Sequence, residues 1–392
     1  MKFKRGRMNR QKLAFRWPGL VVEVLVWLFA ASTAIAQADW KAEWDKTLKA
    51  ARNEGRLAIA HGGGANAAMQ RVFKEEVEKE FPGVRVDLIV GGGRNIAPRV
   101  LAERGAGKYA WDIYIGGTTT ALALLIPGGV LDPIQPAFID PEVTDPGKWF
   151  GGALDFADDA GKFNLALGGN VQPPMAFNTQ MVKGDDIRSF WDLLDPKWRG
   201  KILMFDPRAP GVGLATATFA YVQPSLGKNF LQRLFAEQNV ALTRDYRQLL
   251  EEVARGNYPV GMGVHPSIFK ELASKGLPLG QIAADKIKEG SYLTTATASL
   301  GLVNKAPHPN AAKVFINWLL SREGQMTSQE TGRGRVNSRR IDIPKEIVPP
   351  VGRLVKGVNY LDVEIPERND LTPVLKIVEE ALVENEKRKR AS

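Results

Sequence analysis

The sequence predicts an α/β protein of two lobes joined by crossing strands, and three features of the chain predict it. About 356 residues remain after an N-terminal segment with the pattern of a secretion signal, which is more than one hydrophobic core usually holds. Short apolar or β-branched runs alternate with helical patterns, and glycine follows each run. The same alternation starts again near residue 189, after an extended stretch interrupted by prolines. Each lobe should therefore contain a largely parallel sheet.

The N-terminal segment has the three parts of a secretory signal. Seven basic side chains precede an apolar run at 20–31, and an Ala-Ile-Ala triplet follows. The run is too short to span a bilayer, so we predict a signal peptide over 1–36, cleaved after Ala36, and a periplasmic protein. An uncleaved anchor is the alternative, and Met8 is an alternative start.

The charge of the mature chain argues against nucleic acid as a partner. The formal net charge of +10 falls to +4 when the seven positive and one negative side chains of the signal segment are removed. The high isoelectric point therefore comes largely from the signal. The chain has no cysteine, which excludes disulfides, thiolate metal sites and a lipid-bearing cysteine after the signal.

Glycine and proline mark the ends of the predicted helices and strands of the first lobe. Its strands run into the turns His61-Gly62-Gly63-Gly64, 91–93 and 116–117, and helical spacing fills the intervals. The predicted order is a helix at 40–53 closed by Gly55, a strand at 57–60, a helix at 65–81, a strand at 84–90, a helix at 95–104 and a strand at 111–115.

The second lobe repeats this order after a capping-box pattern at Ser189 and Asp192. Its predicted elements are a strand at 201–205, helices at 230–237 and 246–255, a strand at 260–264, and helices at 267–275 and 371–384. The last helix should pack on this lobe through one apolar face, formed by Leu375, Val378 and Leu382.

Two extended stretches, 163–179 and 294–304, are predicted to cross between the lobes. Because the chain leaves and returns, the lobes should be joined by at least two strands and could hinge. The first lobe is accordingly assigned to 37–168 and 295–335. The second is assigned to 169–294 and 336–392.

The stretch NKAPHPNAAKVFINWLLSREGQ, at 304–325, predicts a packing helix in the first lobe. Two prolines stop the preceding strand, Asn310 can cap the first amides, and the helix should begin at Ala311 and end at Gly324. One buried side is predicted for Ala311, Val314, Phe315, Trp318 and Leu319.

Several glycine-rich turns resemble enzyme motifs without completing them. The His-Gly-Gly-Gly turn matches a hydrolase oxyanion hole, but the chain has no Gly-x-Ser-x-Gly nucleophile elbow. The same turn resembles a dinucleotide fingerprint, but Gly91 stands where an acidic residue would bind ribose. No Gly-Lys pair precedes Ser or Thr, and the three histidines are far apart. We therefore expect no enzyme, no cofactor and no metal site.

The repeated glycine turns favour an anion site. In an open α/β sheet such turns meet at the carboxyl edge, where backbone amides and helix N-termini attract negative charge. Arg94, Arg208 and Arg244 lie in or beside these turns, and each could bind an oxyanion through two hydrogen bonds. The alternatives are that the turns only reverse the chain, and that the arginines are solvated or form salt bridges.

Four stretches resemble bacterial extracellular solute-binding proteins, in the branch that includes ferric-ion-binding proteins. They are APHPNAAKVFINWLLSREGQ, SFWDLLDPKWRGKILMFDP, VARGNYPVGMGV and ERGAGKYAWDIYIGG, and the resemblance covers essentially the whole mature chain. It implies the type II periplasmic-binding-protein fold, with a ligand cleft between the lobes. It also implies a monomeric receptor that delivers a small solute to an ABC-type permease in the inner membrane.

One departure from the resemblance concerns the ligand. Ferric-binding relatives present two adjacent tyrosines after the strand predicted at 260–264, and this chain has His265 there and no Tyr-Tyr pair. We therefore expect a phosphonate, a phosphate ester or a carboxylate. The alternatives are ferric ion held by a non-standard ligand set, such as Tyr246 or Tyr114 with His61, or a receptor for a membrane sensor.

The ligand must contact both lobes to favour their closure. The first-lobe candidates are Gly62, Gly63, Arg94, Gly117 and Thr118. The second-lobe candidates are Arg208, Gly211, Gly213, Arg244 and His265.

Overall fold

The computed structural model describes residues 40–62, 67–91, 93–209, 211–295, 298–331, 337–363 and 370–391, without the side chains of 67–70, 72, 93, 94 and 267. The predicted signal peptide, its cleavage after Ala36 and the alternative start at Met8 lie outside the described residues. Within them, no helix is both long and apolar enough to cross a bilayer.

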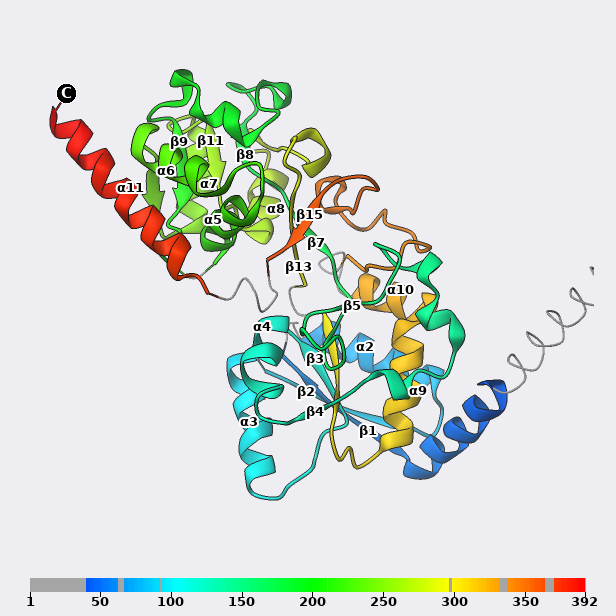
Figure 1. Cartoon of the computed structure of the whole chain (residues 1–392). Helices are drawn as coiled ribbons and strands as arrows, with labels where there is room; N and C mark the ends of the chain where they lie inside the picture. Colours follow the sequence, from blue (N-terminus) through cyan, green and yellow to red (C-terminus); the bar gives the residue numbers. More distant parts are fainter. Residues whose placement is uncertain are drawn as a thin grey trace, which may run out of the picture.

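Two α/β lobes lie one above the other, as predicted, and each has its own sheet (Figure 1). The sheet of the first lobe has the order β2-β1-β3-β14-β6-β5, with β4 paired to β14. Strands β2, β1 and β3 are parallel, and β14 runs against β3. The strands are β1 (Arg56–His61), β2 (Arg85–Val90), β3 (Ile113–Gly116), β4 (Leu131–Asp132), β5 (Asp155–Phe156), β6 (Leu165–Ala166) and β14 (Ser299–Val303).

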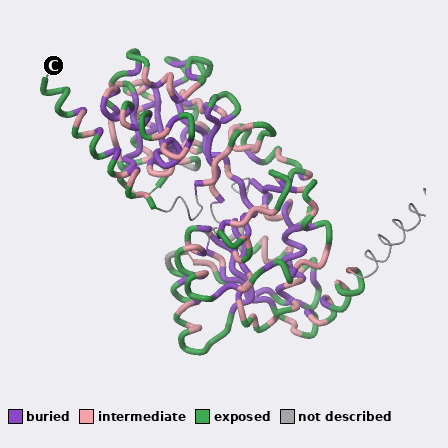
Figure 2. Tube along the Cα trace, in the orientation of Figure 1, coloured by how far each residue is buried: buried purple, intermediate pink, exposed green. Residues whose placement is uncertain are grey.

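Helices cover both faces of the first sheet because its strands are apolar on both sides. Leu57 and Ile59 of β1 pack toward the helix at 40–54, α2 and α9, whereas Ala58 and Ala60 pack toward α3 and the turn of π-helix η1. Figure 2 shows this buried centre within the exposed surface. The helices are α2 (Ala67–Glu80), α3 (Gly93–Gly105), α4 (Thr118–Thr120), η1 (Ala121–Leu125), α9 (Pro309–Leu320) and α10 (Arg322–Thr331).

The second lobe repeats the three-layer arrangement around the sheet β10-β9-β11-β8-β12. Ile202 and Met204 of β9 pack toward α5, α6 and α11, and Leu203 and Phe205 pack toward α7 and α8. The strands are β8 (Ala176–Asn178), β9 (Ile202–Phe205), β10 (Ala241–Thr243), β11 (Val260–Met262) and β12 (Leu279–Gln281). The helices are α5 (Val212–Val222), α6 (Gly227–Glu237), α7 (Tyr246–Arg255), α8 (Pro266–Ser274) and α11 (Thr372–Ala391).

A three-stranded sheet lies between the lobes. It consists of β7 (Asn170–Gln172), β13 (Ser291–Thr294) and β15 (Tyr360–Asp362), in the order β15-β13-β7. β7 lies in the first predicted crossing. The second crossing lies earlier than predicted, because β13 crosses whereas most of 294–304 forms β14 inside the first sheet. β15 adds a third strand, parallel to β13, that sequence reasoning did not predict.

The packing helix of the first lobe begins earlier than predicted and is capped differently. α9 starts at Pro309, and the carboxylate of Glu54 accepts hydrogen bonds from the backbone amides of Asn310 (3.2 Å) and Ala311 (2.8 Å). Asn310 is therefore not the cap. The helix also ends at Leu320 rather than at Gly324, which lies in the first turn of α10.

The apolar stripe of α9 is confirmed and is wider than predicted. All five predicted side chains are buried. Asn317, on another side of the helix, is also buried, and its Oδ1 accepts hydrogen bonds from the backbone amides of Ile139 (2.8 Å) and Asp140 (3.0 Å). α9 is therefore enclosed by the first lobe on nearly every side.

The C-terminal part of the chain differs from the prediction in two respects. Residues 338–341, which the prediction placed in the second lobe, hydrogen-bond through their backbone to 148–150 and 167 of the first lobe. α11 packs on the second lobe as predicted. Its buried face is formed by Val374, Ile377, Val378, Ala381 and Asn385, with Leu375 and Leu382 only partly buried.

Candidate functional site

Three first-lobe candidates gather where β1 and β3 end. The backbone amide of Gly62 donates to the carbonyl of Ile115 at 2.7 Å, so the turn after β1 lies against β3. Gly117 and Thr118 follow β3, and the Oγ1 of Thr118 is 3.1 Å from that of Thr295, just past β13. Gly62, Gly117 and Thr118 are thus brought together. Gly63 and the side chain of Arg94 lie outside the described residues, and both remain predictions.

The side chains beneath these turns are neutral at physiological pH. Burial lowers the pKa of His61 to about 4, which keeps its imidazole uncharged. Burial raises the pKa of Tyr114 to about 12, and its hydroxyl donates to the Gly117 carbonyl at 3.3 Å. Among the described groups, this edge of the first lobe therefore offers backbone and hydroxyl groups rather than charge.

In the second lobe, one buried carboxylate holds two of the predicted arginines. Asp206 directly follows β9, and its side chain is only 5% exposed. Arg208 donates to it through Nε and Nη2, both at 2.9 Å, and Arg244 donates through Nε at 3.1 Å. Burial alone would raise the pKa of Asp206, but the hydrogen bonds from Arg208 and Arg244 outweigh it and hold this pKa below its usual range.

The two arginines differ in what they can still bind. Arg208 uses two nitrogens on Asp206 and lines a groove of about 490 Å³ beside β10 and α11. Arg244 is 67% exposed and uses only Nε on Asp206. Arg244 is thus better placed to reach a solute, and the salt-bridge alternative applies chiefly to Arg208.

The N-terminus of α5 completes the second-lobe group. The Tyr246 hydroxyl accepts a hydrogen bond from the Val212 amide at 3.0 Å, and its ring stacks on Phe205 with centroids 3.9 Å apart. A Cβ on Gly211 would lie 2.2 Å from that hydroxyl, and a Cβ on Gly213 would lie 2.1 Å from the Phe205 carbonyl oxygen. Both glycines are therefore required by close packing.

His265 lies beside this group as the residue before α8. Its ring is 5.1 Å from that of Tyr246, centroid to centroid, and burial lowers its pKa. The five second-lobe candidates therefore collect around the carboxyl ends of β9, β10 and β11, as the parallel order of these strands requires.

Both groups of candidates adjoin the crossing segments. Gln172 of β7 donates through Nε2 to the carbonyl of Val264, next to His265, at 2.8 Å. Thr295, after β13, contacts Thr118 of the first lobe. The crossing strands therefore connect the two strand edges that carry the candidates (Figure 1).

Sequence reasoning missed Asp206 and assigned Tyr246 only to a possible iron site. The sequence shows only that Asp206 directly follows a buried strand; its contact with Arg244, 38 residues later, depends on the pairing of β9 with β10. The role of Tyr246 as a hydrogen-bond acceptor for α5 depends on a contact 34 residues away in sequence and had no local signal.

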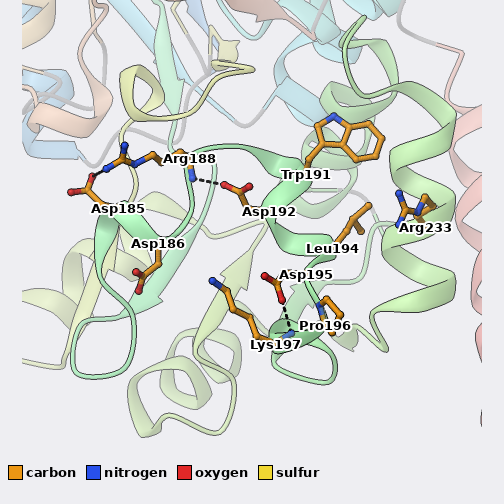
Figure 3. Close-up of a pocket in the computed structure, with 10 residues that line it drawn as sticks. All are labelled: Asp185, Asp186, Arg188, Trp191, Asp192, Leu194, Asp195, Pro196, Lys197 and Arg233. Atoms are coloured by element: carbon orange, nitrogen blue, oxygen red, sulfur yellow. Dashed lines mark hydrogen bonds and ion pairs between the residues drawn. The ribbon is translucent and has the colours of Figure 1, made fainter.

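A surface hollow of about 700 Å³ on the second lobe is not the predicted site (Figure 3). Its acidic side chains are engaged locally, since Asp192 accepts from the Arg188 amide and Asp195 from the Lys197 amide. Its four aspartates outnumber its three basic side chains, so the hollow carries no net positive charge to attract an anion. The hollow is lined by Asp185, Asp186, Arg188, Trp191, Asp192, Leu194, Asp195, Pro196, Lys197 and Arg233.

The fold and the placement of the candidates define a two-lobed solute-binding protein of the type II periplasmic class. The chain belongs to the family described as bacterial extracellular solute-binding protein, whose model matches residues 57–333. The members of this family are the solute-binding components of ABC transporters and not enzymes, which agrees with the prediction from the sequence.

Comparisons with individual proteins agree with this assignment. An uncharacterized protein of Haemophilus influenzae is 25% identical over 289 residues, which covers 72% of this chain and 78% of that protein. Ferric iron-binding protein A of Mannheimia haemolytica, in an open conformation, superposes with a TM-score of 0.63 at 14% identity, covering 83% of this chain and 98% of that chain. The fructose-6-phosphate-bound periplasmic binding protein AfuA of Actinobacillus pleuropneumoniae superposes with a TM-score of 0.53 at 20% identity, covering 85% of this chain and 99% of that chain. At these identities the two structures share the fold.

Proposed function

We propose that this protein is a periplasmic receptor that delivers a small anionic solute to an ABC-type importer in the inner membrane. The observation that carries the proposal is the Asp206 cluster, in which one buried carboxylate faces two guanidinium groups. The cluster keeps one net positive charge beside the N-terminus of α5. Arg244 extends this charge into solvent, where a carboxylate, phosphonate or phosphate ester can meet it.

The neutral character of the first-lobe edge supports the same class of solute. His61 is uncharged and the hydroxyls of Tyr114 and Thr118 are bonded to neighbouring groups, so no described side chain there adds negative charge against an anion. The Gly62 amide already donates to the Ile115 carbonyl, so the donor that this lobe supplies to a bound oxygen is the backbone amide of Gly117, in the turn after β3.

Ferric ion is a poorer fit to the described side chains. A phenolate is the ligand that ferric ion prefers, but burial raises the pKa of Tyr114 to about 12, and the Tyr246 oxygen accepts a hydrogen bond from Val212. In the described part of the chain, no three His, Cys, Asp or Glu side chains lie together as a metal site would require. The iron-binding relative and the sugar-phosphate-binding relative share this fold, so the fold does not distinguish an iron site from an anion site. The preference for an anion therefore rests on the side chains named above.

Binding would shift the protein toward a closed population, because a solute held by Arg244 and by the Gly117 amide contacts both lobes. A solute that touched only one lobe would bind without favouring closure. The proposed solute is therefore small enough to span the two strand edges at once.

A thermal-shift screen of the mature chain tests the proposal. We expect carboxylates, phosphonates or phosphate esters to raise the melting temperature without being consumed, and ferric citrate to act no better than citrate alone. In Arg244→Gln the rise should shrink, with an affinity loss of about 1.5–3 kcal/mol, whereas Arg233→Gln, on a distant helix surface, should respond as the wild type does. A melting temperature that rises with ferric ion but with no anion would overturn the proposal.

A further inference from the structure

Residues 337–363 form a strap that belongs to the first lobe at one end and to the sheet between the lobes at the other. At its start, the Arg339 amide donates to the Leu167 carbonyl at 2.9 Å and its carbonyl accepts from the Phe150 amide at 2.8 Å. At its end, the strap forms β15 and pairs with β13. The strap therefore leaves the first lobe separately from the crossing strands β7 and β13 and then pairs with β13.

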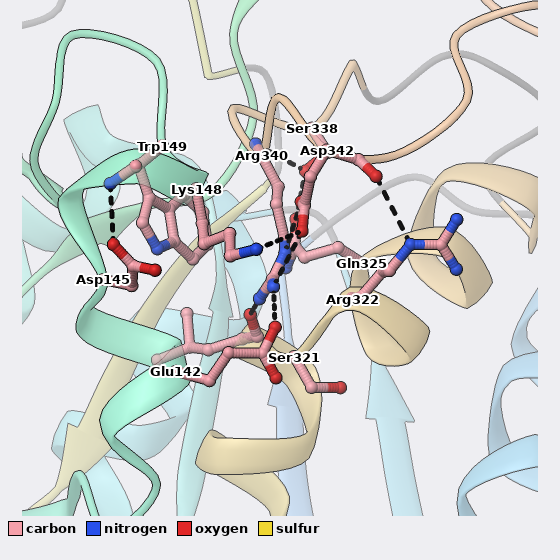
Figure 4. Close-up of polar contacts among 12 residues, drawn as sticks. Glu142, Asp145, Lys148, Trp149, Ser321, Arg322, Gln325, Ser338, Arg340 and Asp342 are labelled. Atoms are coloured by element: carbon pink, nitrogen blue, oxygen red, sulfur yellow. Dashed lines mark hydrogen bonds and ion pairs between the residues drawn. The ribbon is translucent and has the colours of Figure 1, made fainter. Parts of the chain in front are cut away.

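Arg340 anchors the start of the strap to the first lobe (Figure 4). Its side chain is fully buried, its Nη1 donates to the Leu320 carbonyl at 2.8 Å, and its Nε donates to Asp342 at 2.7 Å. It also contacts the carboxylate of Glu142. All these partners lie in the first lobe or in the strap itself, so the anchor does not depend on where the second lobe stands.

Arg339, one residue earlier, has partners on both sides of the lobe boundary. Its side chain is 7% exposed and contacts Asp155 of β5 in the first sheet. Its Nε donates to the Gly168 carbonyl at 3.1 Å. Its Nη2 donates to the carboxylate of Asp362, in β15, at 2.9 Å.

The strand that carries Asp362 is part of the second-lobe packing. Leu361 packs against the second-lobe core, and Val363 is a buried member of it. Tyr292 of β13, which pairs with Leu361, places its hydroxyl 3.1 Å from the Oγ1 of Thr216 in α5. The bond from Arg339 to Asp362 therefore joins the first lobe to a strand that is packed on the second lobe.

We propose that the bond between Arg339 and Asp362 is a breakable latch that sets the ligand-free balance between two relative positions of the lobes. When Asp362 moves away, Arg339 keeps Asp155 and the Gly168 carbonyl, so no buried charge is left unpaired. The Asp362 side chain is 21% exposed and can be hydrated as it leaves. Breaking the ion pair between Arg339 and Asp362 should therefore cost little free energy, unlike breaking the buried contacts of Arg340.

Two substitutions should act in opposite directions. Asp362→Asn keeps the shape and removes the charge, which should weaken the latch and raise the unlatched-to-latched ratio about three- to tenfold. Asp155→Asn removes one of the two described carboxylates on Arg339 and leaves Asp362, which should strengthen the latch and lower that ratio. A merely structural role for this pair would lower stability in both variants without opposite shifts.

The measurement is a distance distribution between the lobes of the full mature chain without ligand. Because the chain has no cysteine, Lys79→Cys and Lys197→Cys supply two unique labelling sites, one on an exposed position of each lobe, for pulsed electron paramagnetic resonance. Opposite changes in the two variants would support the latch. Unchanged distributions, or changes in the same direction, would overturn it. Since no solute is added, that failure would leave the proposed function standing.

Discussion

Replacing Arg208 by Gln should destabilise the second lobe, because it removes two hydrogen bonds from a carboxylate that is 5% exposed. Breaking a buried ion pair usually costs about 3–5 kcal/mol, but Arg208 is itself 39% exposed and Arg244 remains on Asp206. We therefore expect a loss of about 2 kcal/mol. For a unit of this size that corresponds to a fall of about 4–8 °C in melting temperature.

Denaturant unfolding and calorimetry of the mature chain measure this loss against a matched control. Arg233→Gln removes an exposed pair with Glu237 on a helix surface, and its cost should stay within about 0.5 kcal/mol. The lowered pKa of Asp206 means that its stabilisation is present above the unfolded value near 3.9 and is lost as pH falls toward the folded value. The difference in free energy of unfolding between the wild type and Arg208→Gln should thus become smaller below about pH 4. Equal stability of the two arginine variants at pH 7 would show that Arg208 does not stabilise the lobe through Asp206.

Three further predictions concern local packing and titration. Burial lowers the pKa of His61 from 6.5 to about 4, so the fold is most stable above pH 6.5, where this imidazole is neutral in both the folded and the unfolded chain. Acidification to pH 4 should therefore reduce the free energy of unfolding of the wild type by about 3 kcal/mol more than that of His61→Gln. Parallel pH profiles of the two proteins in denaturant unfolding would contradict this. Gly213→Ala should lose about 1–3 kcal/mol in the same assay, since its Cβ would lie 2.1 Å from a backbone oxygen, whereas Gly105→Ala, with open space around it, should be near neutral. Glu54→Gln should reduce the free energy of unfolding by about 0.5–1 kcal/mol and lower the melting temperature slightly, because a neutral group caps α9 less well. An unchanged melting temperature would mean that Glu54 does not cap that helix.

The elements that sequence predicted well are those whose ends are marked locally. α7 begins and ends where predicted, at Tyr246 and Arg255, because Asp245 caps its first amides and Gly256 takes the left-handed conformation after its last turn. The start of α9 was misplaced because its cap is Glu54, which lies 256 residues earlier in the chain. No window of sequence around α9 contains that information.

The same distinction applies to the candidate site. Parallel strand order brought Arg208, Arg244 and His265 to one edge of the second sheet, and this followed from the alternation of elements alone. The buried Asp206 that holds both arginines was missed, since burial and pairing are properties of the folded sheet. β15 was missed because three residues of ordinary β-propensity give no signal until a partner strand is present.

Native mass spectrometry of the mature protein, purified gently from the periplasm, would identify the solute that the protein holds. We expect a one-to-one complex with a small organic anion, released on mild unfolding and absent in Arg244→Gln. A ferric ion or a cationic solute as the co-purified species, retained by that variant, would contradict this expectation.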